Sequence, residues 1–314
     1  MEMMRGPIPP RSLLVSFQTE TTMRSGLLIL LTSCALAAPV VAQDDTGSIE
    51  ATELTAEEQV AELIDEYTEA QQAFYKKIRA AETDEDRDKI IESDAPDSTA
   101  VVAGLMKIAS DHKGSGAAFT ALNWIVQNAE EPAASASAID TILADHIENA
   151  ELKGLCSMLQ RNMNTASSQA LEKILAGSPH DEVRGQACYS LASQMNATAN
   201  LARKLQNGSA SEDYLNYYTQ NLGEERMAEL KKADVNALGE QAVKLYERVV
   251  SEFGDIENRR GTLGSSAERA LFELKNLQIG MLAPEIEAGD LDGVSFKLSD
   301  YRGKVVVLDF WGNW

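Results

Sequence analysis

The stretch Thr55–Ile78 reads TAEEQVAELIDEYTEAQQAFYKKI, and it decides the class of fold. Its first four residues have the form of a capping box, in which a threonine hydroxyl and a glutamate carboxylate each accept a hydrogen bond from the other residue's backbone N–H. The apolar residues that follow recur every three or four positions, which is the spacing of one helix face. They are Val60, Leu63, Ile64, Tyr67, Phe74 and Ile78. The sequence therefore predicts a long amphipathic helix.

Apolar stripes of the same spacing continue to about residue 278, with short polar turns between them. Each stripe predicts one short helix. Helices that follow one another in this way suggest stacked helical hairpins similar to TPR or HEAT arrays, although the stripes repeat with no fixed period. We therefore expect a helical domain over residues 43–278. The stripes begin at Val101, Phe119, Ile139, Leu152, Leu171, Val183, Ala242 and Ala267.

Local signals mark interruptions of this helical pattern. The acid-rich stretch Glu82–Asp97 has neither an apolar stripe nor the ligand spacing of an EF-hand, and we expect it to be a solvated loop. Ser178 followed by Pro179 is typical of a capping residue and the first position of a helix. Gly254 follows an apolar stripe and predicts the end of that helix.

The composition limits the classes of function. The chain of 314 residues carries a formal net charge of −21, and so acidic a protein repels phosphate backbones and anionic lipids. We therefore expect no nucleic-acid partner. Hydrophobic residues make up 44% of the chain, which is enough to fill a core. The three cysteines and three histidines are scattered without ligand spacing, so we expect no metal centre and no cofactor.

The N-terminal segment has the layout of a secretory signal peptide. One arginine after Met23 is followed by the apolar run Gly26–Ala38 and by small residues that end at Ala42. This pattern predicts that residues 1–42 are removed, with Met23 as the true start. The run is shorter than the ~20 residues of a spanning helix, so we expect no membrane span. The protein is then exported to the periplasm or cell envelope; a lipoprotein acylated at Cys34 ranks second.

The periodicity changes at Ile279. The dipeptide Asp292-Gly293 is a strong signal for a hairpin turn. Apolar and polar side chains alternate directly after it, from Val294 to Ser299, as they do in a half-buried strand. The run Val305–Trp311 is short, β-branched and apolar, which is typical of a central strand covered on both faces. These features predict strands after the helical region.

Three segments of this region carry a resemblance to a known family. They are Ile279–Ile286 (IGMLAPEI), Asp290–Gly293 (DLDG) and Leu298–Trp314 (LSDYRGKVVVLDFWGNW). Together they resemble the opening of redoxin domains, which are thioredoxin-fold proteins of the AhpC/TSA and TlpA-like type. The resemblance implies that residues 279–314 are the N-terminal part of a thioredoxin-like domain. The fold class is then mainly α, followed by the first β-strands of an incomplete α/β domain.

The resemblance also implies an activity, which is thiol-disulfide exchange through thiolate attack and a mixed disulfide. The Trp311-x-x-Trp314 spacing is similar to the thiol-disulfide oxidoreductase branch, in which these residues flank the active site. Asp309 matches the carboxylate that accepts a proton from the second thiol; the alternative is a strand-end aspartate that faces solvent. The implied partners are protein thiols and disulfides, or a reductant protein.

In this family a Cys-x-x-Cys pair follows the position of Trp314. The pair is not part of the 314 residues, so we expect this chain to have no redox activity of its own. An unfinished gene sequence or a frameshift explains its absence. An in-frame UGA codon read as selenocysteine is the sharper hypothesis.

Other interpretations stay open. In one, the helical region is a protein-interaction module and the redoxin segment is vestigial; in another, the protein is an AhpC/TSA-type peroxidase. Cys156 and Cys188 both lie on apolar stripes, which is typical of buried core cysteines. A structural disulfide between them is the alternative.

Overall fold

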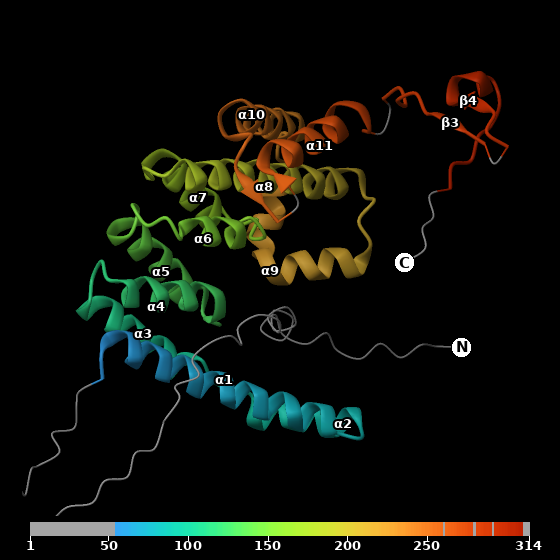
Figure 1. Ribbon diagram of the computed structural model, residues 1–314. Coiled ribbons are helices and arrows are strands. Elements are labelled where there is room, and N and C mark those ends of the chain that lie inside the picture. Colours follow the sequence, from blue (N-terminus) through green and yellow to red (C-terminus); the bar gives the residue numbers. More distant parts are fainter. Residues whose placement is uncertain (1–53, 260, 279–280, 291, 310–314) are drawn as a thin grey trace, which may run out of the picture. The chain divides into compact units, whose positions relative to one another are not determined.

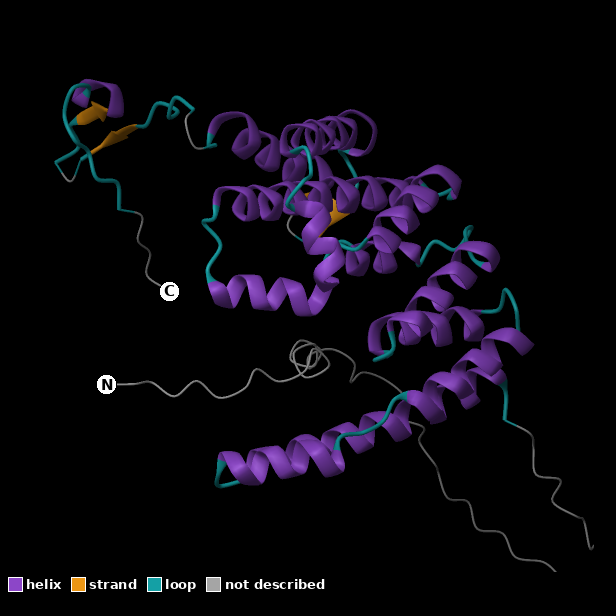
Figure 2. Cartoon of the chain, turned by 180° about the vertical axis from the view of Figure 1, so that it is seen from behind, coloured by secondary structure: helices purple, strands orange, loops and turns teal. Residues whose placement is uncertain are grey.

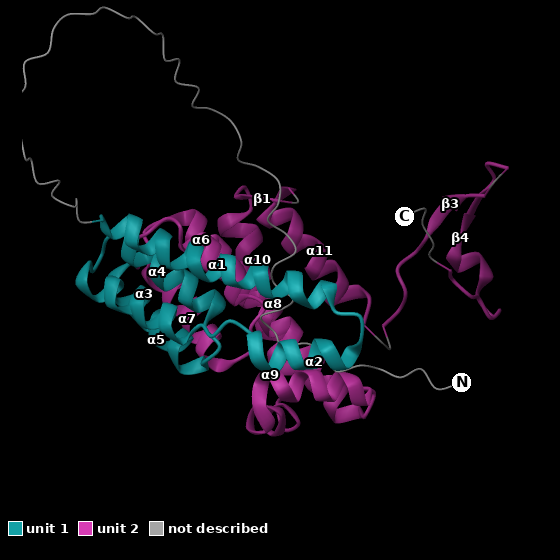
Figure 3. Cartoon of the chain, turned by 90° about the horizontal axis from the view of Figure 1, so that it is seen from below, with its two compact units in different colours: residues 1–146 teal, residues 147–314 magenta. Residues whose placement is uncertain are grey.

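A computed structural model describes residues 54–259, 261–278, 281–290 and 292–309. The chain is mainly helical, with a few short strands toward its C-terminal end (Figure 1, Figure 2). The predicted signal peptide and Cys34 lie outside the described residues. Residues 1–146 and 147–314 form two compact units, here called unit 1 and unit 2 (Figure 3).

Unit 1 is built from successive helices that pack on their neighbours. Helix α1 contacts α3 and α4, and α4 contacts both α3 and α5. The bounds of these helices are α1 (Ala56–Ala80), α2 (Asp84–Asp94), α3 (Thr99–Asp111), α4 (Gly116–Asn128) and α5 (Pro132–Asp145).

The start of α1 confirms the capping box. The Thr55 hydroxyl accepts the Glu58 N–H at 3.2 Å, and the Glu58 carboxylate accepts the Thr55 N–H at 2.8 Å. The predicted stripe is buried at Val60, Tyr67 and Phe74. Two backbone N–H groups at this helix end are thereby satisfied, while one face packs into the unit.

The acid-rich stretch after α1 corrects the sequence prediction, because it forms helix α2 rather than a loop. Thr83 caps this helix by accepting the N–H of Asp86 at 3.1 Å. The first turn holds Asp84, Glu85 and Asp86, and acidic groups there are favoured by the positive end of the helix dipole. No residue of α2 is buried, so the helix has no apolar stripe by which it could be recognised.

Unit 2 is arranged around one long helix, α8, which contacts α6, α7, α9, α10 and α11. In a linear repeat array each repeat contacts only its neighbours. The similarity to TPR or HEAT arrays therefore gains no support from unit 2. The helix bounds are α6 (Leu152–Leu159), α7 (Thr165–Gly177), α8 (Asp181–Asn207), α9 (Glu212–Leu230), α10 (Val235–Phe253) and α11 (Leu263–Asn276).

Helix α8 contributes to two separate core clusters. One cluster joins it to α10 and α11 and contains Cys188, Ala192, Ala242, Tyr246, Val249, Phe253, Leu263 and Ala267. The other lies toward its C-terminal end and contains Met163, Leu201, Ala202, Met227 and Leu230. The packing of unit 2 therefore depends on this helix along most of its length.

A buried polar row also runs along α8, at Gln186, Ser190, Gln194 and Thr198. Gln194 is 1% exposed, and its amide donates to the carbonyl oxygens of Leu159, at 3.3 Å, and Asn162. Its own oxygen accepts the Ser168 hydroxyl at 2.7 Å. These bonds tie the end of α6 and the start of α7 to α8, because a buried amide must find partners.

The start of α8 differs from the prediction. The helix begins at Asp181, and Ser178 is the residue that ends α7. The Ser178 hydroxyl accepts the N–H of His180 at 3.4 Å, so Pro179 lies in the turn and not at the first helical position. The predicted end of α10 is confirmed at Gly254. A short hairpin that the sequence did not reveal follows, with β1 (Glu257–Asn258) antiparallel to β2 (Gly261–Thr262).

The segment after α11 contains the predicted hairpin. Strands β3 (Glu287–Gly289) and β4 (Ser295–Lys297) are antiparallel, and Ala288 lies opposite Phe296. Gly293 in the turn has a φ of 80°, a conformation that glycine adopts without strain. The 3₁₀ turn η2 (Leu298–Tyr301) follows directly.

Candidate functional site

The β3–β4 hairpin and η2 lie within the segment that resembles redoxins and form a small framework. Glu287 and Lys297 lie opposite each other in the hairpin and form a 3.1 Å ion pair. The Glu285 carboxylate accepts the Ser299 N–H at 3.0 Å. Hydrogen bonds from Ser299 hold the pKa of Glu285 below its ordinary value. The chain before β3 is thereby fixed to the turn after β4.

The turn that follows β4 is closed by its own backbone and side chains. The Asp300 carboxylate accepts the Lys297 N–H at 3.1 Å, and the N–H of Lys304 donates to the Tyr301 carbonyl at 3.1 Å. The Tyr301 ring packs edge-on against Phe296, and Gly303 has a φ of 83°. Residues Leu298–Lys304 therefore form a defined turn that is followed directly by Val305.

The run after this turn is not the buried strand that the sequence predicts. Val305 and Val307 are 97% and 87% exposed, and Val306 and Leu308 are 42% and 51% exposed. No strand of the described residues pairs with this run. The prediction requires other elements to pack on both faces of this strand. No such elements bury it in the described part of the chain.

The structure describes only some of the candidate residues of the segment that resembles redoxins. Asp309 is exposed, so the described residues give its carboxylate no buried surroundings. Trp311 and Trp314 lie outside the described residues. The proton-accepting role of Asp309 and the flanking role of the tryptophans stay predictions.

Cys156 on α6 and Cys188 on α8 are both buried and free. The alternative disulfide between them is not formed in the structure. Burial raises the pKa of the Cys156 thiol to about 12 and that of Cys188 to about 11. A thiol becomes a nucleophile as the thiolate, so neither group is suited to disulfide exchange at neutral pH.

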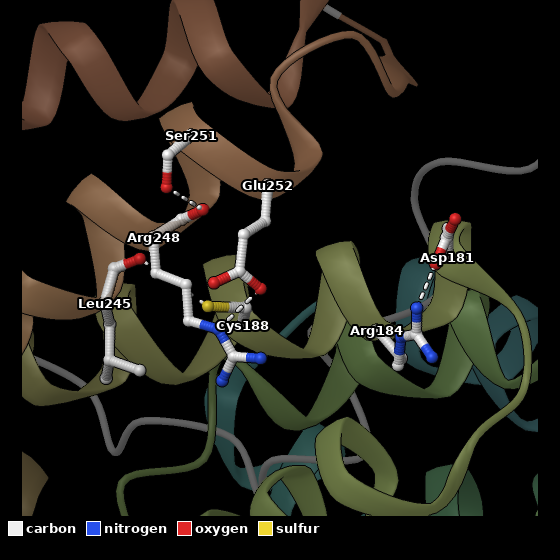
Figure 4. A network of polar contacts seen from close by, with 7 residues as sticks. All are labelled: Asp181, Arg184, Cys188, Leu245, Arg248, Ser251 and Glu252. Carbon is white, nitrogen blue, oxygen red and sulfur yellow. Dashed lines mark hydrogen bonds and ion pairs between the residues drawn. The ribbon is translucent and has the colours of Figure 1, made fainter.

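A polar network lies beside Cys188 (Figure 4). Its thiol is 3.5 Å from the Leu245 carbonyl oxygen, and the Arg248 Nε donates to Glu252 at 2.9 Å. Arg248 lowers the pKa of Cys188 and Glu252 raises it, both less strongly than burial does. The thiol therefore stays protonated despite a neighbouring guanidinium.

The same arginine lines an open groove between α7, α8 and α10. Arg184 also lines it and forms an ion pair with Asp181 (Figure 4). Its lining also includes the apolar side chains of Leu175 and Phe253. The sequence gives little sign of these arginines; its signal is the Asp181-x-x-Arg184 spacing at the start of a helix.

Two kinds of site are not seen among the described residues. No group of three or more His, Cys, Asp or Glu side chains there is placed to hold a metal ion. In that same part of the chain, no helix is long and apolar enough to cross a membrane.

Part of the chain is similar to known proteins. Thiol-disulfide oxidoreductase ResA from Geobacillus thermodenitrificans (strain NG80-2) is 50% identical over 36 residues, which is 12% of this chain and 21% of the relative. The protein of the same name from Geobacillus kaustophilus (strain HTA426) is 53% identical over 36 residues. The one from Bacillus thuringiensis (strain Al Hakam) is 38% identical over 55 residues, or 17% of this chain and 32% of the relative.

These matches cover a short part of both chains. The chain spans about a fifth to a third of the length of the curated relatives it matches. No known family model matches the chain. No solved structure matches it either. A short part of this mainly helical chain is therefore similar to thiol-disulfide oxidoreductases.

Proposed function

We propose that the chain belongs to an exported thiol-disulfide oxidoreductase of the redoxin or TlpA-like type, with residues 279–314 as the start of its catalytic domain. The observation that carries the proposal is the 50% identity over 36 residues with a relative of that name. The hairpin and turn at residues 287–301 support it, because they lie where the resemblance expects the first strands.

The chemistry is a two-step exchange. The first thiolate of a Cys-x-x-Cys pair attacks a substrate disulfide, forms a mixed disulfide and releases one substrate thiol. The second thiol loses its proton and displaces the other substrate thiol, so that the pair ends oxidised and the substrate reduced. In this proposal Asp309 accepts the proton of the second thiol, and Trp311 and Trp314 flank the pair. Cys156 and Cys188 take no part.

The proposal is tested in a chain that carries a Cys-x-x-Cys pair. The full chain is extended after Trp314 with the Cys-x-x-Cys pair and remaining domain of the relative from Geobacillus thermodenitrificans. We expect the extended chain to reduce insulin disulfides with dithiothreitol as the electron donor, and a version with both new cysteines changed to serine to be inactive. An extended chain that is folded, yet no faster than the serine version, contradicts the proposal.

A matched pair of variants tests the segment itself. In the extended chain, Val306→Lys places a charge in the predicted central strand and is expected to abolish activity, because that strand is then buried. Glu92→Lys, on exposed α2, leaves activity unchanged. If both variants stay equally active, residues 305–308 are not part of the catalytic domain's core.

The proposal also includes export of the protein and a role for its helical region. A signal peptide over residues 1–42 places the protein in the periplasm or cell envelope, and N-terminal sequencing of the secreted protein tests this. In this proposal the helical region binds a protein partner. A peroxidase of the AhpC/TSA type is less well supported, because the relatives reported above carry the name thiol-disulfide oxidoreductase.

A further inference from the structure

The connector between unit 1 and unit 2 is held by two histidines. Helix α5 ends at Asp145 and α6 begins at Leu152, so residues 146–151 link the units. His146 begins the connector and belongs to unit 1. His180, at the start of α8, contacts the connector from unit 2.

The unit 1 attachment is a buried imidazole. His146 is 6% exposed, and its ring lies edge-on to Phe119 with centroids 5.5 Å apart. The backbone N–H of His146 donates to the Ile142 carbonyl at 2.9 Å, at the C-terminal end of α5. Its Nε2 is buried and has no hydrogen-bond partner in the part of the chain that the structure describes. A neutral ring tolerates such a site far better than a charged one.

The unit 2 attachment is of another kind. The Nε2–H of His180 donates to the Glu148 carbonyl, with 2.8 Å between nitrogen and oxygen. This nitrogen must carry the proton because a carbonyl only accepts, so the bond persists when the other nitrogen is also protonated. Ile147 packs against Gly177, where a Cβ would lie 3.1 Å from the Ile147 Cγ1. The connector is thus fixed to unit 2 in a way that acid does not oppose.

The two helices that hold His146 carry few ionisable side chains. Helix α4, which supplies Phe119, contains no ionisable side chain, and α5 supplies Asp140 and Asp145. The connector itself carries Glu148 and Glu151. Burial lowers the pKa of His146 below its ordinary value of 6.5, and Asp145 opposes this only in part. The neutral ring therefore stabilises unit 1 fully above pH 6.5, and that stabilisation is lost progressively as the pH falls below it.

We propose that His146 makes residues 146–151 an acid-sensitive joint. When the ring takes a proton from solvent, it becomes a buried cation whose Nε2–H has no acceptor among the described residues, so it leaves Phe119 and frees the connector from unit 1. The bond from His180 to Glu148 keeps the connector on unit 2. Acid thus weakens the attachment at His146 and leaves the hydrogen bond from His180 to Glu148 intact.

Hydrogen exchange of the full chain at pH 7.5 and pH 5.5, corrected for the intrinsic rate at each pH, tests the proposal. We expect exchange in residues 142–151 to rise severalfold at pH 5.5, since each pH unit below the ordinary histidine value shifts the equilibrium by at most about tenfold. Exchange at the start of α8 stays unchanged. No rise in residues 142–151, or an equal rise throughout unit 1, overturns the proposal.

Variants assign the effect to one residue. His146→Phe keeps an aromatic ring without a titrating group and is expected to abolish the pH dependence; His146→Gln is the second variant should phenylalanine disturb packing. His112→Phe, at an exposed histidine, leaves the dependence intact. His180→Ala raises exchange of the connector at both pH values. A pH-dependent rise that survives both His146 variants contradicts the proposal.

Discussion

The backbone N–H of Gly264 donates a 3.0 Å hydrogen bond to the carbonyl of Gly254, so the end of α10 touches the first turn of α11. A Cβ on Gly264 would lie 2.8 Å from that oxygen and 2.9 Å from the Gly254 Cα. Both atoms belong to the backbone, which cannot swing aside as a side chain does. The β1–β2 hairpin between the two helices closes around this contact.

Gly264→Ala is therefore expected to destabilise unit 2 by about 1–3 kcal/mol, as overpacking does in other proteins. The free energy of unfolding from urea titration measures the loss. Gly239→Ala in α10 is the matched control, because a Cβ there meets nothing within 4 Å. That change should stabilise the helix by about 0.5–1 kcal/mol. Equal effects of the two changes would refute the close contact.

Gln194→Ala removes the amide that joins α6 and α7 to α8. It leaves the Leu159 and Asn162 carbonyls without this donor, at a cost of about 1–3 kcal/mol for a buried polar group. Thermal unfolding followed by circular dichroism measures this loss. Gln220→Ala, at an exposed position of α9, should change stability by less than about 0.5 kcal/mol. If Gln194→Ala leaves the stability unchanged, the buried polar row on α8 is not needed for stability.

Cys156 and Cys188 should resist thiol reagents in the folded chain at pH 8, because burial raises their pKa values to about 12 and about 11. The measurement is the rate of reaction with Ellman's reagent in a Cys34→Ser background. In urea both thiols should react at once, since unfolding returns them to water. Fast reaction of the folded chain would contradict the buried placement.

The raised pKa of Cys188 also predicts a loss of stability in alkali. The pKa of its thiol is 9.0 in the unfolded chain and about 11 in the folded chain. This contribution of Cys188 to stability is complete below pH 9.0 and is lost as the pH rises toward 11. Cys188→Ala should lose this part of the alkaline dependence, and an unchanged pH profile would argue against it.

The 314-residue chain should neither reduce insulin nor consume peroxide. Its described thiols are buried, and the exposed Asp309 has no thiol beside it among the described residues. Turnover that survives replacement of both Cys156 and Cys188 by serine would contradict this expectation. Turnover lost on that replacement would instead assign activity to the buried pair.

Limited proteolysis should cut within residues 281–309 before it cuts the helices. Val305 and Val307 are almost fully exposed, and a short hairpin of two strands is marginally stable alone. Mass spectrometry of the first products after trypsin or chymotrypsin identifies the cuts. If the helices are cleaved first while this segment stays intact, the segment is protected by contacts that the described residues do not include.

The helices whose faces are buried could be predicted from sequence, as α1 and α10 show. Their apolar residues follow the helical spacing, and local signals at Thr55 and Gly254 mark their ends. Helix α2 was not predicted because none of its residues is buried. Its sequence signals are its cap and its acidic first turn. The two-residue strands β1 and β2 are too short to show any alternation.

The candidate site was harder to predict than the fold, for a physical reason. The dipeptide Asp292-Gly293 predicted the hairpin, because the residues of a tight turn are a local signal. Burial of Val305–Leu308 depends on partner strands, which no local pattern contains. In the same way, the orphaned Nε2 of His146 arises from tertiary packing against Phe119, and a lone histidine in the sequence gives no sign of it.

The position of α8 in the chain has a consequence for synthesis. Its residues Cys188 and Ala192 leave the ribosome well before Leu263 and Ala267, which complete their cluster. At about 5–20 residues per second, this apolar face waits several seconds for its partners. During that interval the nascent chain presents a surface of the kind that chaperones bind, and a stalled or slowed ribosome between α8 and α11 would prolong it.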